Sequence, residues 1–530
     1  MKKILLHLTT ALALVVAVSI QINAQPTLDN TFSGDGVLLK TVSASGDDIG
    51  RSVLIQNNGR ILTGGNSFNM IGYSDIHIIR TKTNGNMDNT FGTGGVATIS
   101  GGFFCDMALL PNGKIIVAGS GVGPTNVNNF IVYRLTKNGA LDNTFGTGGS
   151  VEVNMPNKNM ICFDVIIQAD NKILLAGYAD DGYGGHHNMI IVRLKANGSL
   201  DNTFATAGKF TFIQSIKSSE CNQLALQPDG KIVAGGFIDT LMFYAFYRYD
   251  FAALRLNTNG TLDNTFGIGG VVRANKGETD IASSVSILSD GRIVLGGSTD
   301  YLGNDRFAAL CLMPDGTYDM SFGTGGWTYL DFYGGNAGCS AMVAEPDDDL
   351  ILAGLAYIYA GASYQTIALA KLLSDGTPDN TFGDNGIDTS FFGITTLGCN
   401  DIALQTDNKI VIAGYHYEGS QSSYLLARYT NSATFMKQPI AETDQITNFT
   451  LYPNPAVDQF LIQCTLPENT TFALVAIYDV NGNMIYQNQL PKTDGNISEI
   501  ISTEHFPSGI YFVKMIADKF IHTERIVISK

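Results

Sequence analysis

Residues 141–149 read Leu141-Asp142-Asn143-Thr144-Phe145-Gly146-Thr147-Gly148-Gly149. The first five positions recur with small changes six more times, at 28–32, 87–91, 200–204, 262–266, 318–322 and 378–382. Successive copies begin 59, 54, 59, 62, 56 and 60 residues apart. A period of this length indicates supersecondary units that stack on their neighbours, so this stretch decides the fold class.

Each unit contains four short segments that suit β-strands. In the second unit they are 106–110, 115–119, 130–135 and 151–154, and they are rich in apolar and β-branched residues. Asn112-Gly113 separates the first two segments and suits the positive φ of a tight type I′ hairpin. Four antiparallel strands per unit predict an all-β fold in which each unit is one blade of a β-propeller, with a β-solenoid as the alternative.

The number of units predicts a ring of seven blades. The turn between the first two strands occurs seven times, and so does the third strand, which last appears at 424–429. The Asp-Asn-Thr-Phe segment also occurs seven times, but its first copy stands alone near the N-terminus and none follows Tyr429. We therefore expect residues 31–41 to supply the outer strand of the last blade, because this closure leaves no spare sheet edge.

The repeated phenylalanine is expected to pack between blades, while the Asp and Thr beside it hydrogen-bond the local backbone. Repeats rich in Gly, Asp and Asn can also hold calcium. One carboxylate per turn is too few for a cation that takes six or more oxygen ligands. No cofactor is therefore expected, with calcium as the weaker alternative.

Residues 1–24 have the pattern of a secretory signal peptide. Lys2 and Lys3 precede an apolar stretch at 12–20, and Ile22-Asn23-Ala24 forms a small-residue cleavage sequence. Without these two lysines, 30 basic residues remain against 48 acidic ones, a net charge of −18. Such a charge repels nucleic acid, so no nucleic-acid partner is expected. No later segment is long and apolar enough to be a transmembrane helix.

The cysteine count is odd, at seven. Four cysteines, each ten positions before a matching turn residue, occupy one equivalent place in the repeat: Cys162, Cys221, Cys339 and Cys399. Equivalent places on different blades lie around a ring, where a disulfide reaches poorly. Buried thiols are therefore expected, with a metal site or a cross-blade disulfide as alternatives.

Three motifs recur in fixed order over residues 28–431: the opening stretch, the hairpin exemplified by 227–236, and the strand exemplified by 253–257. Together they resemble the delta-60 repeat of secreted bacterial proteins. The sixth unit departs from the pattern at Met320-Ser321 and at 347–349. The resemblance implies a propeller domain over 25–431. It implies no catalytic residues, because the family is defined by its repeat. The hairpin also resembles the NHL type of blade, which is mostly a binding scaffold.

The repeat stops after Tyr429, and a polar stretch at 432–447 is the expected linker. Residues 448–530 contain six further strand candidates and predict a small immunoglobulin-like β-sandwich. This segment resembles the type A sorting domain of the type IX secretion system through motif residues that include Tyr452, Pro453, Asn454, Pro455, Gly509 and Tyr511. The resemblance implies a Bacteroidetes exporter, the type IX machinery as partner, and delivery through the periplasm to the outer-membrane surface or the medium.

The loops between the second and third strands vary most and are rich in tyrosine, asparagine and aspartate. They share a face with the loops that lead into the first strands, and binding residues favour loops on a rigid scaffold. The candidate binding face comprises Tyr73, Asp181, Tyr183, His187, Tyr247, Tyr301, Asp305, Tyr359 and Tyr417. Aromatic rings with polar tips suit a carbohydrate or a surface protein. The sequence thus favours an exported binding or adhesion module.

A hydrolase is the alternative. Asp106 and Asp164 occupy equivalent positions, as does Asp401, and carboxyl groups at a channel mouth could cleave a glycoside or an ester. His186 and His187 are adjacent, but no third metal ligand is identifiable. No nucleophile elbow or phosphate loop occurs in a fitting context. The sequence therefore assigns no catalytic or metal-binding residue.

Overall fold

The computed structural model describes residues 26–43, 46–68, 74–122, 127–180, 185–214, 217–241, 247–277, 279–301, 303–359, 363–390, 397–419, 421–431, 447–466, 473–478, 484–490, 496–517 and 520–530. Every regular element in these ranges is a β-strand. The chain divides into two compact units, Met1–Ala433 and Thr434–Lys530. The expected signal peptide lies outside the described residues.

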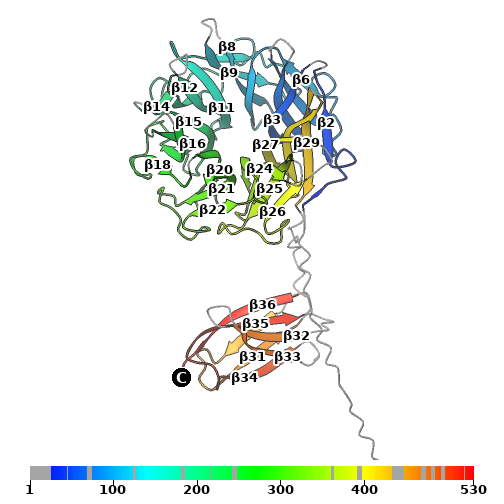
Figure 1. The fold of residues 1–530 in the computed structure, drawn as a ribbon, viewed down its shortest axis with the longest axis vertical. Coiled ribbons are helices and arrows are strands. Elements are labelled where there is room, and N and C mark those ends of the chain that lie inside the picture. The colour runs from blue at the N-terminus through cyan, green and yellow to red at the C-terminus, as the bar shows by residue number, and fades with distance from the viewer. Residues whose placement is uncertain are drawn as a thin grey trace, which may run out of the picture. The chain divides into compact units, whose positions relative to one another are not determined.

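The larger unit is a ring of seven antiparallel sheets around a central channel, which is a β-propeller (Figure 1). The innermost strands, in chain order, are β3 (Asp48–Ile55), β7 (Phe103–Leu109), β11 (Asn159–Ile167), β15 (Ser219–Leu226), β19 (Asp280–Ile287), β23 (Ala337–Ala344) and β27 (Leu397–Leu404). The second strands are β4 (Ile61–Phe68), β8 (Ile115–Val122), β12 (Ile173–Asp180), β16 (Ile232–Leu241), β20 (Ile293–Tyr301), β24 (Leu350–Tyr359) and β28 (Ile410–Glu418).

The third strands are β5 (Ser74–Thr81), β9 (Asn128–Leu135), β13 (Asn188–Leu194), β17 (Tyr247–Leu256), β21 (Asn304–Leu312), β25 (Ser363–Leu372) and β29 (Gln421–Thr430). The outer strands of the first six blades are β6 (Val96–Ile99), β10 (Ser150–Val153), β14 (Lys209–Phe212), β18 (Val271–Ala274), β22 (Trp327–Leu330) and β26 (Ile387–Ser390).

The seventh blade is closed by the N-terminal part of the chain. The strands β1 (Thr27–Leu28) and β2 (Val37–Lys40) both pair antiparallel with β29, and Val37 lies opposite Ala427. Figure 1 shows β2, in blue, beside the yellow-orange β29 from the end of the repeat region. The circular closure expected from the phase of the repeat is confirmed.

Seven apolar clusters lie between neighbouring blades, one at each interface of the ring. Each cluster contains one of the repeated, fully buried phenylalanines. Phe145, for example, packs on the next blade at Gly198, where an added Cβ would lie 3.0 Å from its ring. The repeated phenylalanine is therefore the packing residue between blades, as expected.

The hairpins between first and second strands differ from the expected type I′ turn. Gly59 N donates to Gln56 O at 2.7 Å, and Gln56 N donates to Arg60 O at 2.8 Å. Gly59 has a φ of 76°, whereas Asn58 is not in the left-handed region. This is the pattern of a three-residue loop, a type I turn followed by one left-handed residue. The Asn58 side chain stabilises it by accepting Arg60 N at 3.1 Å.

Every innermost strand contains a β-bulge at the same place. In β11 the register shifts between Cys162 and Asp164, which leaves Phe163 unpaired. The opposite residue, Gly177, makes room for the bulge, because a Cβ there would lie 1.9 Å from Ile161 O. The same glycine recurs in the other blades at Gly65, Gly119, Gly236, Gly297, Gly354 and Gly414.

A buried arginine joins each regular repeat to the next blade. In the third blade, Arg193 Nε lies 2.9 Å from Asp201 Oδ2, and its Nη1 donates to the carbonyl of Thr258 at 2.5 Å. The guanidinium also lies 4.5 Å from the centre of the Phe204 ring. Thr203 donates to Asp201 through its hydroxyl at 2.7 Å, as the repeat predicts. The same carboxylate–arginine–phenylalanine arrangement occurs at Arg80, Arg134, Arg255 and Arg428.

In two blades, a different residue supplies the cation that contacts the repeated aspartate. In the fifth blade Cys311 replaces the arginine, and Arg292 from the neighbouring hairpin contacts both Asp319 at 3.1 Å and Ser374 O at 3.0 Å. In the sixth blade Lys371 replaces the arginine. The irregular sixth unit therefore keeps the fold by exchanging the cation.

The smaller unit is a β-sandwich of two antiparallel sheets. One sheet contains β30 (Thr447–Tyr452), β31 (Gln459–Thr465) and β34 (Asn496–Ser502). The other has the order β33 (Met484–Leu490), β32 (Ala473–Tyr478), β35 (Gly509–Ala517) and β36 (Phe520–Ile528). A single apolar core lies between them and includes Phe460, Val475 and Val513.

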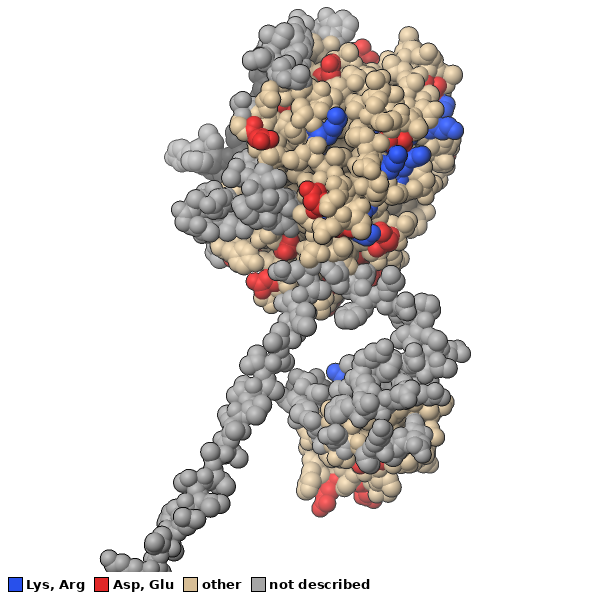
Figure 2. Space-filling model, turned by 90° about the vertical axis from the view of Figure 1, so that its right-hand side faces the viewer, with Lys and Arg blue, Asp and Glu red and all other residues tan. Residues whose placement is uncertain are grey.

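The surface of the propeller carries few charges. Figure 2 shows acidic and basic side chains scattered among uncharged residues on one side of the molecule, without a patch of either sign.

Across the part of the chain that the structure describes, no helix could span a membrane.

Candidate functional site

The seven bulges build two rings of side chains in the central channel. The unpaired bulge residues form the channel mouth, which comprises Arg51, Cys105, Phe163, Asn222, Ser283, Ser340 and Asn400. The residues directly after them form the polar ring, which comprises Ser52, Asp106, Asp164, Gln223, Ser284, Ala341 and Asp401. Most of both rings line a cavity of about 690 Å³.

Side chains of the polar ring bond to the backbone of the next blade. Asp401 accepts Val53 N at 2.7 Å, Asp106 accepts Val165 N at 3.2 Å, and Asp164 accepts Leu224 N at 2.7 Å. Gln223 accepts Val285 N at 2.7 Å in the same way. The sequence-predicted acids are thus brought into one cavity, but each also links two blades.

The three carboxyl groups hold their protons more tightly than usual. Burial, with the charge of Asp106 as the second cause, raises the pKa of Asp401 to about 7. Burial also raises the pKa of Asp106, and burial together with the Asp106 charge raises that of Asp164 well above its ordinary range. Asp164 is buried, whereas Asp106 and Asp401 are half-buried beside the channel. The cluster can therefore carry protons near neutral pH.

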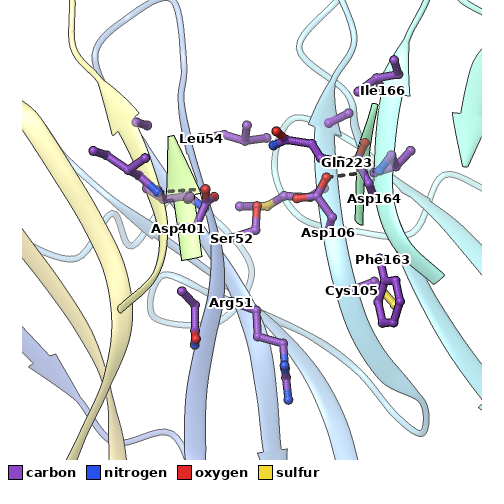
Figure 3. A pocket seen from close by; sticks show the side chains of 18 of the residues that line it. Arg51, Ser52, Leu54, Cys105, Asp106, Phe163, Asp164, Ile166, Gln223 and Asp401 are labelled. Carbon is purple, nitrogen blue, oxygen red and sulfur yellow. Dashed lines mark hydrogen bonds between the residues drawn. The ribbon is translucent and has the colours of Figure 1, made fainter. Parts of the chain in front are cut away.

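Ser52 is on the first blade, between Asp401 on the seventh and Asp106 on the second, and Figure 3 shows it between these two acids. Its hydroxyl is buried and makes no hydrogen bond of normal geometry. Arg51 lies to one side of the carboxyl layer, with Cys105 and Phe163 (Figure 3). Along the channel, a mouth of mixed character is thus followed by a layer that contains the three acids.

Among the described residues, one group of three carboxylates has the spacing of a metal site, Glu345, Asp347 and Asp349. Lys371 contacts two members of this group, since its Nζ lies 2.7 Å from Glu345 Oε2 and 3.5 Å from Asp349 Oδ2. The group lies in the hairpin at the positions that Gln227, Asp229 and Lys231 occupy in the fourth blade. The counterpart of the arginine contact is the one between Lys371 and Asp379, at 3.7 Å.

Two aromatic groups flank the channel mouth on opposite sides of the ring. On the third blade, Phe163 lies 5.7 Å from Tyr178 between ring centres, and Tyr178 stacks on His187 at 3.9 Å. On the sixth and seventh blades, Tyr415 and Tyr417 pack edge to face at 5.3 Å, and Tyr357 is 42% exposed. Together these six residues are the mouth aromatics.

The Tyr415 ring covers the innermost strand of its blade, because a Cβ on Gly398 would lie 2.0 Å from it. Burial raises the pKa of Tyr415, and nearby Tyr417, Tyr357 and Arg51 contribute to its electrostatic environment. The second aromatic group is therefore close to the mouth residue Arg51.

His187 lies in the loop before β13 and is held there by contacts with two carboxylates. Its Nδ1 lies 2.5 Å from Glu220 Oε1 on the next blade, and its Nε2 lies 3.9 Å from Asp180 Oδ2. The hydrogen bond with Glu220 is the main cause that raises the pKa of His187. The residue thus joins two blades and supports the stacked Tyr178.

The other residues of the expected face are dispersed. Asp305 is exposed on β21 opposite Asp300 and belongs to neither aromatic group. Tyr247, Tyr301 and Tyr359 have backbone positions at the ends of strands, and their side chains are not described. Tyr73, Asp181 and Tyr183 lie outside the described residues. Of the nine expected positions, His187 and Tyr417 belong to the aromatic groups.

Sequence reasoning missed three residues at or beside the mouth, namely Arg51, Phe163 and Tyr178. The glycine opposite each bulge is the signal that could have found them. It marks where the innermost strand is irregular and hence which residue turns toward the mouth.

The sorting motif of the smaller unit attaches one segment to β36. Asn454 Nδ2 donates to Arg525 O, and Asn454 Oδ1 accepts Val527 N, both at 2.9 Å. Tyr511 is buried and donates to Pro507 O at 2.8 Å, while Gly509 begins β35. Tyr452, Pro453 and Pro455 are exposed. The motif is therefore partly structural and partly available at the surface.

These features define a seven-bladed repeat propeller joined to a separate β-sandwich. A family model described as a domain of unknown function (DUF5122) β-propeller matches seven times, at 56–91, 110–145, 168–204, 227–266, 288–322, 345–382 and 405–433. A model described as a secretion system C-terminal sorting domain matches 450–529. The chain belongs to this propeller repeat family and ends in a type IX sorting domain, which indicates export to the cell surface or the medium.

No curated protein sequence matches the chain. Among solved structures, it is similar to a protein of unknown function from Dyadobacter fermentans at 14% identity, 74% coverage of this chain, 99% of the other and a TM-score of 0.39. It is also similar to a fungal alcohol oxidase of the AA5 family, in complex with copper, at 12% identity, 93% and 98% coverage, and a TM-score of 0.38. No function is drawn from likenesses at these scores.

Proposed function

We propose that this protein is a binding and adhesion module that works outside the cell and holds a carbohydrate at the channel mouth. The observation that carries the proposal is the pair of mouth aromatic groups: one lines a cavity of about 690 Å³ through Phe163, and the other lies close to the mouth residue Arg51. Aromatic faces cover the apolar faces of sugar rings, while Arg51 and Asn400 offer hydrogen bonds to hydroxyl groups.

The position of the acids supports binding over hydrolysis. Asp106, Asp164 and Asp401 lie one residue beyond the mouth and each accepts a backbone N–H from the adjacent blade. A carboxylate that already holds two blades together is poorly placed to leave its partner during a reaction. The propeller would thus retain a glycan without cleaving it, and the sorting domain would present it at the surface of a Bacteroidetes-type cell.

The test is binding of the full chain to a glycan and polysaccharide array, with retention and product release recorded in parallel. Phe163→Ala and Tyr415→Ala should each weaken retention about tenfold, because each removes one aromatic face. Tyr333→Ala is the matched control, since Tyr333 is exposed and hydrogen-bonded to Asp384 and belongs to neither aromatic group. Equal retention by all three variants would refute the mouth as the site. Binding to proteins but to no glycan would refute the carbohydrate as the ligand.

A hydrolase is the second candidate, and the pKa of Asp401 at about 7 is the observation in its favour. A general acid works best when its pKa lies near the working pH. Product release that disappears in Asp401→Asn while retention persists would establish this reading. Release that is unchanged in Asp401→Asn would exclude Asp401 as the acid.

A further inference from the structure

Two cysteines from different blades meet at the channel mouth. Cys105 is the bulge residue of β7, and Cys162 is the residue just before the bulge of β11. Both line the same cavity of about 490 Å³ on the mouth side of the channel. Cys105 also packs against the apolar cluster that contains Cys162. These positions are not equivalent in the repeat. The argument that a disulfide reaches poorly between equivalent positions of different blades therefore does not apply to them.

One hydroxyl group brings the two cysteines together. Ser120 Oγ on β8 accepts Cys162 N at 2.9 Å and lies 3.8 Å from Cys105 Sγ. Both cysteines therefore contact the same serine hydroxyl, Cys105 through Sγ and Cys162 through its backbone N–H. Cys162 is buried, whereas Cys105 is half-buried and borders the cavity.

We propose that Cys105 and Cys162 form a disulfide that joins the second and third blades at the channel mouth. An exported protein leaves the reducing cytosol, so a close pair of thiols is free to oxidise. The remaining five cysteines fit the expectation of buried thiols, since each is buried on a separate strand.

The oxidant is a disulfide donor, either a thiol–disulfide oxidoreductase or a small-molecule disulfide. The Cys105 thiolate attacks one donor sulfur, the donor S–S bond breaks, and one donor thiol leaves. The Cys162 thiolate then attacks the Cys105 sulfur of this mixed disulfide and releases the second donor thiol. The two cysteines lose two protons and two electrons, and the donor disulfide is reduced to two thiols.

The order of these steps follows from exposure. Cys105 borders the cavity and is the thiol that an external donor can reach. Burial raises the pKa of the Cys162 thiol well above its usual range, so the closing step is slow once the blades have packed. We therefore expect complete bridging when the donor is present during folding, as it is during export.

The test is thiol counting on the full chain refolded in a glutathione redox buffer, followed by alkylation under denaturing conditions without a reductant. The chain has seven cysteines, so one bridge leaves five alkylated thiols, and reduction restores seven. Peptide mapping should find Cys105 joined to Cys162. Seven alkylated thiols in the oxidised protein, or a bridge between other residues, would overturn the proposal.

Two variants with six cysteines each should give different numbers of alkylated thiols. Cys105→Ser removes the bridge and should show six alkylated thiols, whereas Cys399→Ser, at the position equivalent to Cys162, keeps it and should show four. Equal counts in the two variants would refute the assignment. Because each comparison uses a soluble refolded sample, a variant that fails to fold is replaced by Cys105→Ala or Cys399→Ala.

The fifth and sixth blades offer a reconstruction of the same site. Ser298 Oγ accepts Cys339 N at 2.9 Å, as Ser120 does for Cys162, and Ser283 occupies the place of Cys105. Ser283→Cys should therefore form a second bridge, to Cys339, and lower the alkylated count to four of eight. A count of six in this variant would show that the shared serine does not set the geometry.

Discussion

At the scale of single residues, the acids of the propeller fall into two classes that respond to pH in opposite ways. Asp201 belongs to the first class. Burial alone would raise its pKa, but hydrogen bonds from Thr203 and the charges of Arg193 and Lys172 lower it to about 2. Asp401 belongs to the second class, because burial and a neighbouring acid raise its pKa to about 7. The first class stabilises the fold only when ionised, and the second only when protonated.

The second class predicts that the propeller loses stability as the pH rises from about 4 to about 7. The folded state binds Asp401's proton more tightly than the unfolded chain, whose pKa is near 3.8, so stability is greatest below that value and levels off above 7. Because channel water screens this half-buried group, we expect ~1–2 kcal/mol from it.

Asp401→Asn tests this pH dependence, because it keeps an acceptor for Val53 N but cannot ionise. Melting temperatures between pH 4.5 and 8 should fall less steeply for the variant than for the wild type. Asp35→Asn is the control, as Asp35 is exposed and likewise accepts a backbone N–H, from Val37 at 3.0 Å. Parallel curves for wild type and Asp401→Asn would contradict the prediction.

The buried arginine is the other residue whose effect can be predicted. Arg193→Ala removes the partner of buried Asp201 and the bond to the next blade, so we expect a loss of ~3 kcal/mol in the free energy of unfolding. Arg193→Lys should recover part of this loss, since Lys371 serves the sixth blade. Chemical denaturation would measure both. A loss below ~1 kcal/mol in Arg193→Ala would show that the contact is replaceable.

At the scale of the element, the innermost strand and its bulge decide where functional side chains lie. The bulge turns one extra residue toward the mouth and the next into the polar ring. It is possible because the second strand has a glycine opposite. The glycine that recurs in each second strand is thus required by the backbone. The side chains of the bulge residues differ between blades and are free to serve binding.

This requirement predicts that Gly177→Ala is strongly destabilising. Its Cβ would lie 1.9 Å from Ile161 O, so the bulge must move, and we expect a loss of ~2–3 kcal/mol. Gly338→Ala is the matched control, because the nearest atom to its Cβ is Ser298 Oγ at 3.7 Å. Thermal unfolding of both variants tests the prediction, and similar melting temperatures would contradict it.

At the scale of the whole molecule, the ring depends on its N-terminal segment. Phe32 packs between the seventh and first blades, and Asp29 pairs with Arg428 at 2.8 Å. Residues 26–43 therefore belong to the seventh blade, although more than 380 positions separate them from β29. Closure of this kind replaces an exposed sheet edge by a paired one.

Closure predicts the outcome of two rearrangements. A chain without residues 26–43 should aggregate, since β29 becomes an exposed edge. A permuted chain that carries 26–43 after residue 431 should be monomeric, because Thr27 already lies opposite Thr430. Size-exclusion chromatography distinguishes these outcomes. A monomeric deletion, or an aggregated permutation with unpaired β29, would refute the role of the segment.

Much of this molecule was predictable because its information repeats. Seven copies of Asp-Asn-Thr-Phe and seven hairpin turns determined the number of blades, the phase of closure and the packing residue between blades. The sorting domain was predictable from its motifs. These features depend on local backbone preference and on apolar periodicity, and both can be read directly from the sequence.

Tertiary structure alone decided which side chains meet. The bulges convert Asp106, Asp164 and Asp401 into one layer and turn Phe163 toward the mouth. They also bring Cys105 into one cavity with Cys162. The sequence shows each of these residues but not their distances. A ring closes through contacts between blades about sixty residues apart, and a single unpaired residue in each strand changes which side chains face the channel.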